Sequence, residues 1–201
     1  KTISVQSKIV LSPAEGNVGD TVAVTGTGFT GGKTAGLVFG ADSLLSNIAV
    51  DTAGTISTTF KVPKGKNGQQ KVTVTDTNTI AASATFTVET TAPAVPKIGS
   101  PGKDGVSGFI GDARVDFKWG NVTDPSGINY EIQVAAEPNF NAPIFQHKDI
   151  IAAEYKSTNN ETLPNGEYYW RIRAIDGAGN TSAWTEATHF KAGLVSTGTF
   201  I

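Results

Sequence analysis

The sequence predicts an all-β protein made of two consecutive antiparallel β-sandwiches that are joined by a short, proline-containing linker. Three observations support this fold class. Short runs of alternating apolar and polar residues recur along the chain, and clusters of Gly, Pro and Asp separate them. Thr and Gly are abundant and Met is absent, which is typical of strands and turns. The length of 201 residues fits two domains of about 100 residues each.

Seven alternating runs in the first segment are predicted to be strands, because their polarity changes with a period of two residues. They are Ile9–Ser12, Thr21–Thr25, Thr34–Phe39, Ile48–Val50, Ile56–Val62, Gln70–Asp76 and Ala82–Val88. No window of about 12 residues keeps an apolar helical period, so we expect no helix here. Strands that begin roughly every 8–15 residues predict a sandwich of about seven strands.

The glycines between positions 26 and 31 spell G-x-G-x-x-G, a pattern that binds dinucleotide phosphates in other proteins. That function needs a helix directly after the glycines, whereas residues 35–40 (AGLVFG) have the pattern of a strand. A P-loop would also need glycine at the position of Thr27. Both phosphate-binding interpretations fail, and we predict a glycine-rich turn between strands with Phe29 in the core.

The first segment also carries a recognisable series of spaced residues. They are Pro13, Gly16, Gly19, Val22, Val24, Gly26, Gly28 and Phe29, followed by Val38-Phe39-Gly40, the Asp51–Gly54 turn, Val62-Pro63, Gly68 and Phe86-Thr87-Val88. This series resembles an IPT/TIG domain, an immunoglobulin-like module. The resemblance implies a spacer or binding unit, as in bacterial surface proteins, secreted carbohydrate-active enzymes, some receptors and transcription factors. Binding of DNA by such modules relies on basic loops, whereas the lysines here are scattered and are interpreted as solvated surface.

The boundary between the domains is placed in the stretch Thr90–Lys97, which contains Pro93 and Pro96. We predict domains at residues 1–90 and 91–201. Prolines bias the backbone toward polyproline II, so a short and stiff linker is expected. Each module would then span on the order of 30 Å, from ~3.3 Å per residue along its strands.

The second segment begins with a turn cluster at Pro101–Gly105 and has a second turn at Asp124–Gly127. The predicted strands carry Val115, Phe117 and Trp119; Tyr130, Ile132 and Val134; Ile144–Gln146; Glu154–Lys156; and His189-Phe190, which closes the last strand. Between the strand at Glu154–Lys156 and the strand at His189-Phe190 lies a long alternating run. It places Tyr168, Trp170, Ile172 and Ala174 on one face, and Tyr169, Arg171, Arg173 and Ile175 on the other.

A second resemblance rests on Trp119, Tyr130, Leu163, Gly166, Tyr168, residues 170–174 (WRIRA), Gly179-Asn180 and Trp184. These residues resemble a fibronectin type III domain of the prokaryotic kind, so both predicted sandwiches are immunoglobulin-like. The resemblance implies that Tyr168 is a corner tyrosine whose hydroxyl bonds back to the backbone near Leu163. Because the preceding loop is one residue shorter than the common corner, Tyr169 remains the alternative.

The candidate surface contact consists of Tyr169, Arg171, Arg173 and Trp184. Both arginines share the outward face of their strand, and Trp184 begins the neighbouring strand. We predict that Trp184 stacks on one of the arginines, because guanidinium groups are attracted to indole faces. The alternative is that Trp184 and Tyr169 form a platform on which a sugar stacks.

No catalytic, cofactor or metal site is predicted. There is no Cys, which excludes disulfides and thiolate ligands, and neither His147 nor His189 has a ligand-type partner at i+2 or i+4. Residues 105–108 (GVSG) are one residue short of a nucleophile elbow. The acidic residues Asp112, Asp116, Asp124, Asp149 and Asp176 are scattered; a calcium role for Asp124 or Asp176 stays open. With a net charge of −2 and no basic patch, nucleic acid is not expected as a partner.

These patterns favour a non-enzymatic role as a spacer or adhesion stalk in a larger prokaryotic cell-surface or secreted protein. The residues that would carry this role are core aromatics, namely Phe29, Phe39, Phe60, Phe86, Trp119, Tyr130, Tyr168 and Trp170. The alternative is an accessory, glycan-binding module of a secreted polysaccharide-active enzyme. The expected partners are the rest of a longer chain and a surface protein or polysaccharide.

No apolar run reaches the length of a membrane span, so this stretch is not expected to cross a membrane. The apolar ending LVSTGTFI is expected to be a frayed tail, with a linker or the approach to an anchor as alternatives.

Overall fold

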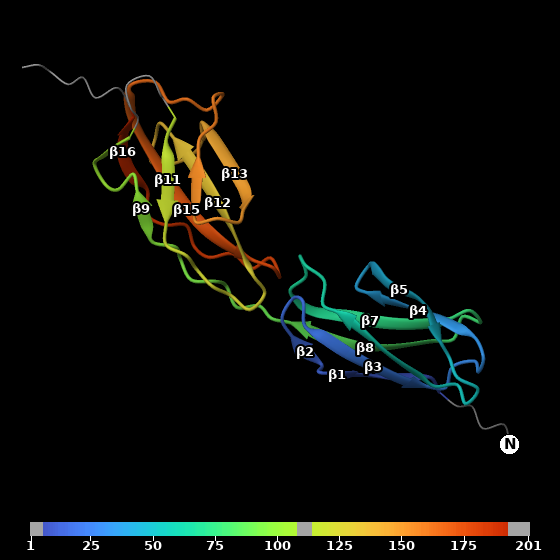
Figure 1. Cartoon of the computed structure of the whole chain (residues 1–201). Coiled ribbons are helices and arrows are strands. Elements are labelled where there is room, and N and C mark those ends of the chain that lie inside the picture. The colour runs from blue at the N-terminus through green and yellow to red at the C-terminus, as the bar shows by residue number, and fades with distance from the viewer. Residues whose placement is uncertain (1–5, 108–113, 193–201) are drawn as a thin grey trace, which may run out of the picture. The chain divides into compact units, whose positions relative to one another are not determined.

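The computed structural model of the chain describes residues 6–107 and 114–192. The chain divides into two compact units, Lys1–Thr91 and Ala92–Ile201. Every regular element of the described residues is a strand (Figure 1). The described residues accordingly contain no helix that is long and apolar enough to cross a membrane.

The first unit is a sandwich of a three-stranded and a five-stranded sheet. Its strands are β1 (Lys8–Ser12), β2 (Glu15–Gly16), β3 (Thr21–Thr27), β4 (Thr34–Phe39), β5 (Asp42–Ala49), β6 (Ile56–Lys61), β7 (Gly68–Asp76) and β8 (Ala81–Val88). The strand orders are β1-β3-β6 and β2-β8-β7-β4-β5. All neighbours are antiparallel except β2 and β8, which run parallel.

The second unit repeats this arrangement. Its strands are β9 (Ile98–Ser100), β10 (Gly105–Ser107), β11 (Asp116–Trp119), β12 (Ile128–Ala135), β13 (Phe145–Ile150), β14 (Glu154–Lys156), β15 (Gly166–Asp176) and β16 (Thr188–Ala192). The strand orders are β14-β11-β9 and β10-β16-β15-β12-β13. Counted within each unit, the eight strands therefore have the same order in both sandwiches, which confirms the predicted all-β, immunoglobulin-like architecture.

In each unit the chain begins in one sheet and then changes to the other. The strand β1 pairs with β3, and the chain then crosses to pair β2 with β8. In the second unit β9 pairs with β11 before β10 pairs with β16. A proline follows the first strand in both cases, at Pro13 and Pro101, and each is preceded by a cis peptide bond. Since proline cannot donate a backbone hydrogen bond, it is suited to the place where one ladder ends.

Both cores are filled by aromatic side chains. In the first unit the rings of Phe39, Phe60 and Phe86 lie 5.6 to 6.3 Å apart. In the second unit the ring of Phe117 lies 5.1 Å from that of Trp170. All eight aromatic residues predicted to be in the cores are buried, which confirms that prediction.

The predicted strands are confirmed, with corrections to two of them. The run Ile48–Val50 is only the end of β5, which begins at Asp42 and stops before Val50. This edge strand pairs irregularly with β4, so its burial does not alternate and the sequence pattern is lost. The run Ile144–Gln146 is the start of the longer β13. Residues 101–105, predicted as a turn, hold the change of sheet that leads into β10.

The glycine-rich turn is also confirmed. Residues 34–39, where a dinucleotide site would need a helix, form β4. Phe29 is 6% exposed, and its backbone N–H donates to the carbonyl of Gly54 at 3.1 Å. A side chain at Gly54 would lie 2.4 Å from the carbonyl oxygen of Phe29, so only glycine fits there.

Candidate functional site

The candidate surface contact lies on β15, the longest strand of the second unit. Its inward residues Tyr168, Trp170, Ile172 and Ala174 are buried, and its outward residues Tyr169, Arg171 and Arg173 are half-buried. The alternation predicted for this run is therefore confirmed. Because residues at i and i+2 share a face, the two guanidinium groups lie side by side on the outer surface of the five-stranded sheet.

The segment between β15 and β16 brings Trp184 onto this outer surface. The backbone N–H of Ser182 donates to the carbonyl of Ala174 at 2.9 Å, and that of Thr185 donates to the carbonyl of Ile172 at 2.9 Å. These bonds hold the segment alongside β15. The prediction that Trp184 begins the neighbouring strand is nevertheless wrong, because β16 begins only at Thr188. Trp184, which lies between the two bonded residues, is fixed beside the arginines.

Trp184 stacks on both arginines. The guanidinium carbon of Arg171 lies 4.5 Å from the centre of the indole, and that of Arg173 lies 4.6 Å from it. The prediction that Trp184 lies against one of them is confirmed and extended. Arg171 also lies 4.3 Å from the ring centre of Phe140, a residue that no sequence pattern connects with this site. The resulting row of Phe140, Arg171, Trp184 and Arg173 is called the arginine ladder below.

Polar side chains of the neighbouring strand β12 hold the arginine ladder in place. In the sheet register Glu131 faces Arg173 and Gln133 faces Arg171. The Nε of Arg173 donates to Glu131 Oε2 at 2.7 Å, and its Nη2 lies 2.6 Å from the same oxygen. The Nε of Arg171 donates to Gln133 Oε1 at 2.8 Å. Each guanidinium is therefore held by an acceptor at the facing position of the paired strand β12.

Glu131 is a fully buried carboxylate on the nominally outer face of the sheet. Besides Arg173 it contacts the side-chain amide of Gln146, and Lys148 Nζ lies 3.6 Å from its Oε1. A buried charge is tolerated only when it is paired and hydrogen-bonded, and these three neighbours meet that need. The strand's alternation could have placed Glu131 and Gln133 on this face, but it gives no hint that Glu131 is covered.

The charges in the arginine ladder are not balanced. Arg171 forms no ion pair within the described residues, and its pKa is lowered by burial and by the nearby Arg173, while Glu131 acts in the opposite direction. Tyr169 lies apart, with its ring 5.2 Å from that of His189. The structure thus brings together Arg171, Arg173 and Trp184 and places Tyr169 beside a different residue. This arrangement can stabilise the sheet or attract an anion.

The corner tyrosine is Tyr168. Its hydroxyl donates to the carbonyl of Pro164 at 3.0 Å, one residue beyond the predicted Leu163. The alternative, Tyr169, has its ring on the other face of the strand. The corner prediction is confirmed for Tyr168.

A second polar cluster joins the two sheets of this unit at their edge. Glu161, in the loop before β15, contacts Nε2 of His147 on β13 and accepts a hydrogen bond from the Tyr155 hydroxyl on β14 at 2.7 Å. The imidazole of His147 stacks on Tyr155 with ring centres 4.7 Å apart. No sequence pattern points to Glu161, because loop residues carry no period that would place them.

The ionisation of this cluster is strongly shifted. Burial by itself would raise the pKa of Glu161, but hydrogen bonds from Thr158, Tyr155 and His147 lower that pKa to about 2. Burial and the adjacent Glu161 carboxylate raise the pKa of Tyr155 well above its usual value. Glu161 is therefore an ionised acceptor and Tyr155 a neutral donor over the whole physiological range.

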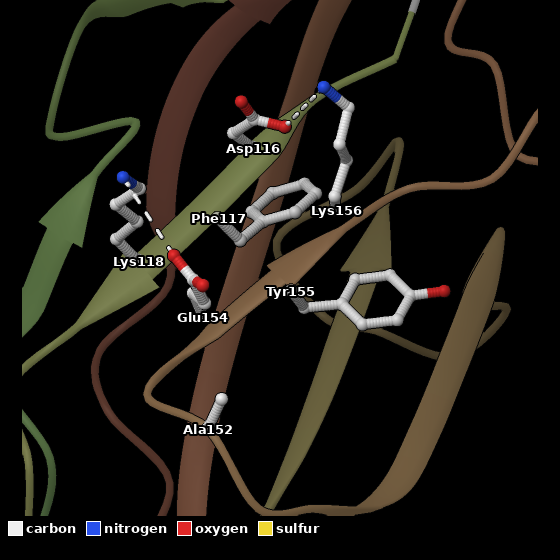
Figure 2. A pocket seen from close by; sticks show the side chains of 7 residues that line it. All are labelled: Asp116, Phe117, Lys118, Ala152, Glu154, Tyr155 and Lys156. Atoms are coloured by element: carbon white, nitrogen blue, oxygen red, sulfur yellow. Dashed lines mark ion pairs between the residues drawn. The ribbon is translucent and has the colours of Figure 1, made fainter.

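A shallow, open hollow of about 370 Å³ lies on β11 and β14 of the same unit (Figure 2). Phe117, Tyr155 and Ala152 supply its apolar lining. Two ion pairs flank it: Lys118 Nζ lies 3.8 Å from Glu154, and Lys156 Nζ lies 3.4 Å from Asp116. Its lysines and carboxylates pair with one another across the two strands.

The scattered acidic residues mostly serve turns. Asp124 Oδ1 accepts from the backbone N–H of Ser126 at 2.8 Å, and Asp176 accepts from the backbone and side-chain N–H groups of Asn180 at 2.8 Å. Asp76 has a similar role in the first unit, where it accepts from the backbone of Thr30, Asn78 and Ile80. Asp112, Gly108 and the segment 194–201 lie outside the described residues.

Both units match family models. Residues 9–88 match the IPT/TIG domain, and residues 109–196 match the Rha78A-like, N-terminal immunoglobulin domain. The resemblance of the first segment to IPT/TIG is thereby confirmed, and the second segment is confirmed as immunoglobulin-like. No curated protein matches the sequence.

The chain is also similar to several solved structures. The fibronectin(III)-like modules of Clostridium thermocellum CbhA are 15% identical, with 96% of this chain and 98% of that chain covered and a TM-score of 0.42. The Yersinia pseudotuberculosis adhesin InvE is 15% identical, with 92% and 58% covered and a TM-score of 0.43. The gamma-CGTase of Alkalophilic bacillus clarkii is 17% identical, with 98% and 27% covered and a TM-score of 0.34.

Proposed function

We propose, from the premise that this chain is a tandem of an IPT/TIG domain and a second immunoglobulin-like domain, that it serves as a spacer or adhesion stalk. The two units would hold other parts of a larger prokaryotic protein at a distance, at the cell surface or in a secreted chain. Domains of these families are typically non-catalytic modules, which supports this role. The work of the chain would then be mechanical, and its functional residues would be those that keep each sandwich closed.

The observation that carries the proposal is the parallel pairing of the second and last strands of each unit, β2 with β8 and β10 with β16. In the first unit the backbone N–H of Thr87 donates to Ala14 at 2.9 Å, and that of Glu89 donates to Gly16 at 3.1 Å. In the second unit β10 runs parallel to β16, and Asp104 N–H donates to His189 at 2.9 Å. A pull on the two ends of a unit slides such strands past one another, so their hydrogen bonds are loaded together and not one by one.

The use of aromatic side chains also supports a spacer over a glycan-binding module. No Phe, Tyr or Trp within residues 6–107 and 114–192 is exposed. Two guanidinium groups already lie over the ring of Trp184, the residue that a sugar platform would need. Sugar-binding surfaces depend on accessible aromatic faces, whereas every aromatic ring in these two ranges is buried or half-buried.

Pulling single molecules by their two ends tests the mechanical role. Two separate unfolding events are expected, each lengthening the chain by on the order of 250–300 Å at ~3.6 Å per residue. Glu89→Pro removes the N–H that bonds to Gly16 and should lower the unfolding force of one event only. Glu89→Ala keeps that N–H and is the matched control. Equal forces for both variants and the parent would contradict the proposal.

Co-sedimentation with insoluble polysaccharides tests the competing function. A spacer should remain in the supernatant with every polymer of the panel. Retention on one polymer that Trp184→Ala abolishes and Tyr155→Phe leaves intact would favour the glycan-binding role instead. Both variants are compared at equal folded fraction, measured by circular dichroism.

A further inference from the structure

The strand β14 leaves one backbone edge of the three-stranded sheet unpaired. It pairs with β11 on one side, and no strand of the described residues pairs with its other side. The N–H of Trp119 donates to the carbonyl of Ala153, and the N–H of Ser157 donates to the carbonyl of Val115, both at 3.0 Å. Since the direction of hydrogen bonding alternates along a strand, the backbone groups of Glu154 and Lys156 point away from β11. The free edge therefore offers two N–H groups and two carbonyl groups.

The side chains on this strand carry opposite charges on either side of its centre. Glu154 and Lys156 flank Tyr155, and their side chains are 64% and 55% exposed. Their present partners, Lys118 and Asp116, lie at the facing positions of the paired strand β11 (Figure 2). Such exposed ion pairs contribute little stability by themselves, so each charged group can interact with a further group of opposite sign.

The sequence of β14 is complementary to itself in the antiparallel direction. If a second β14 is laid alongside the free edge with Tyr155 at the centre, Glu154 faces Lys156 of the second copy and Lys156 faces its Glu154. These are also the residues whose backbone groups point outward, so both pairs would be hydrogen-bonded pairs. Charges of alternating sign would run across the joined sheet, in the order Lys118 and Glu154 of one copy and then Lys156 and Asp116 of the second copy. Opposite charges at facing positions favour a sheet pairing, and like charges oppose it.

We propose that the β14 edge is a pairing surface for a second copy of this chain, related to the first by a twofold axis. The pairing would join two three-stranded sheets into one of six strands. Ile151, which is 82% exposed and lies shortly before β14, would add apolar contact at the rim. This proposal is independent of the spacer role, but it would let neighbouring stalks associate laterally.

The same features limit pairing with unrelated strands. A short edge strand with charged side chains is a common protection against sheet-to-sheet aggregation, because most other strands cannot satisfy its charges. The second copy is the partner whose charges are guaranteed to match. A contact of three residues on each side buries less surface than the roughly 1,200 Å² that stable dimers bury. The association should therefore be weak and depend on protein concentration.

Sedimentation analysis of the whole chain across a wide concentration range tests the proposal. A reversible monomer–dimer equilibrium is expected that weakens as salt is raised toward ~1 M, where charges are screened. Lys156→Glu and Glu154→Lys should each weaken self-association about tenfold or more, because each places like charges opposite one another. Lys71→Glu makes the same change of charge on the first unit and should have no effect.

A mixture of the two variants distinguishes lost pairing from lost folding. Lys156→Glu carries two acidic residues at this edge and Glu154→Lys carries two lysines, so a mixed dimer is again complementary. Mixing them should restore the association that each lacks alone. Amide exchange of Glu154 and Lys156 should slow as the parent chain is concentrated. A chain that stays monomeric at millimolar concentration, or variants that associate as well as the parent, would overturn the proposal.

Discussion

The two tryptophans of the second core differ in what happens to their indole N–H groups. Trp170 Nε1 donates to the carbonyl of Pro101 at 2.9 Å, whereas Trp119 Nε1 is buried without a partner in the described structure. Their rings lie 6.3 Å apart, so both share the same apolar surroundings. A buried donor without a partner costs free energy, and the two residues therefore contribute differently to stability.

Replacing each tryptophan by phenylalanine should reveal this difference. Trp170→Phe leaves the Pro101 carbonyl unpaired, while Trp119→Phe removes a group that had no partner. We expect Trp170→Phe to lower the free energy of unfolding by about 1–2 kcal/mol more than Trp119→Phe. Chemical denaturation of both variants measures the difference. Equal losses would show that the hydrogen bond to Pro101 contributes nothing.

Glu161 makes the stability of the second unit depend on acidity. The pKa of Glu161 is about 2 in the folded chain and 4.5 for an unperturbed glutamate. Its stabilising contribution is therefore complete above about pH 4.5 and is lost as the pH falls toward 2. After allowance for solvent screening, we expect the free energy of unfolding of the parent to exceed that of Glu161→Gln by about 1–2 kcal/mol at pH 5. This gap should close near pH 2. Urea denaturation at several pH values between 2 and 5 measures the gap; a constant gap would contradict the assignment.

At the scale of elements, the arginine ladder ties β12, β15 and the Trp184 segment together. Arg173 balances the buried Glu131, whereas Arg171 is held only by Gln133 and two aromatic rings. The two arginines look equivalent from the alternation of the sequence, but their electrostatic roles differ. Removing the partner of a buried charge is far more costly than removing a stacked cation.

Arg173→Met should therefore destabilise the second unit by about 2–4 kcal/mol, and Arg171→Met by about 1 kcal/mol. In a Glu131→Gln background the cost of Arg173→Met should fall, because no buried charge remains to be balanced. A double-mutant cycle on Arg173 and Glu131, followed by thermal or chemical unfolding, measures this coupling. Additive effects would mean that Lys148 and Gln146 are enough to balance the buried charge of Glu131 without Arg173.

The sequence predicted the elements well where one face of a strand is buried. The runs around Phe39, Phe117 and Trp170 alternate because every second side chain must enter a core. The short strands β2, β9 and β10 were missed, because each has only two or three residues and one of them is a glycine, which indicates a turn. The start of β5 was missed because an edge strand with irregular pairing buries neither face consistently.

The candidate site was only half predictable for a related reason. Arg171, Arg173 and Trp184 lie close in sequence, so their common face follows from strand geometry. Glu131 reaches the same place through the pairing of β12 with β15, which depends on the register of the fold. Phe140 reaches it from the segment between β12 and β13. The cluster of His147, Tyr155 and Glu161 joins two strands and a loop, and no local pattern encodes that meeting.

At the scale of the whole molecule, each unit has a core of its own, and the two cores share one strand order. We therefore expect each unit to fold without the other. Fragments 1–91 and 92–201, expressed separately, should each give a cooperative unfolding transition with a stability within the usual range of about 5–15 kcal/mol. Circular dichroism and denaturant titration of the fragments test this. A fragment that remains unfolded would show that the units depend on one another.

The first core is built around phenylalanine, and the first unit contains neither tryptophan nor tyrosine. All three tryptophans and all four tyrosines belong to the second unit. Indole fluorescence and near-ultraviolet absorbance are therefore optical reporters of the second unit alone. Comparing them with the far-ultraviolet signal, to which both units contribute, would let one intact sample reveal which unit melts first without any added label.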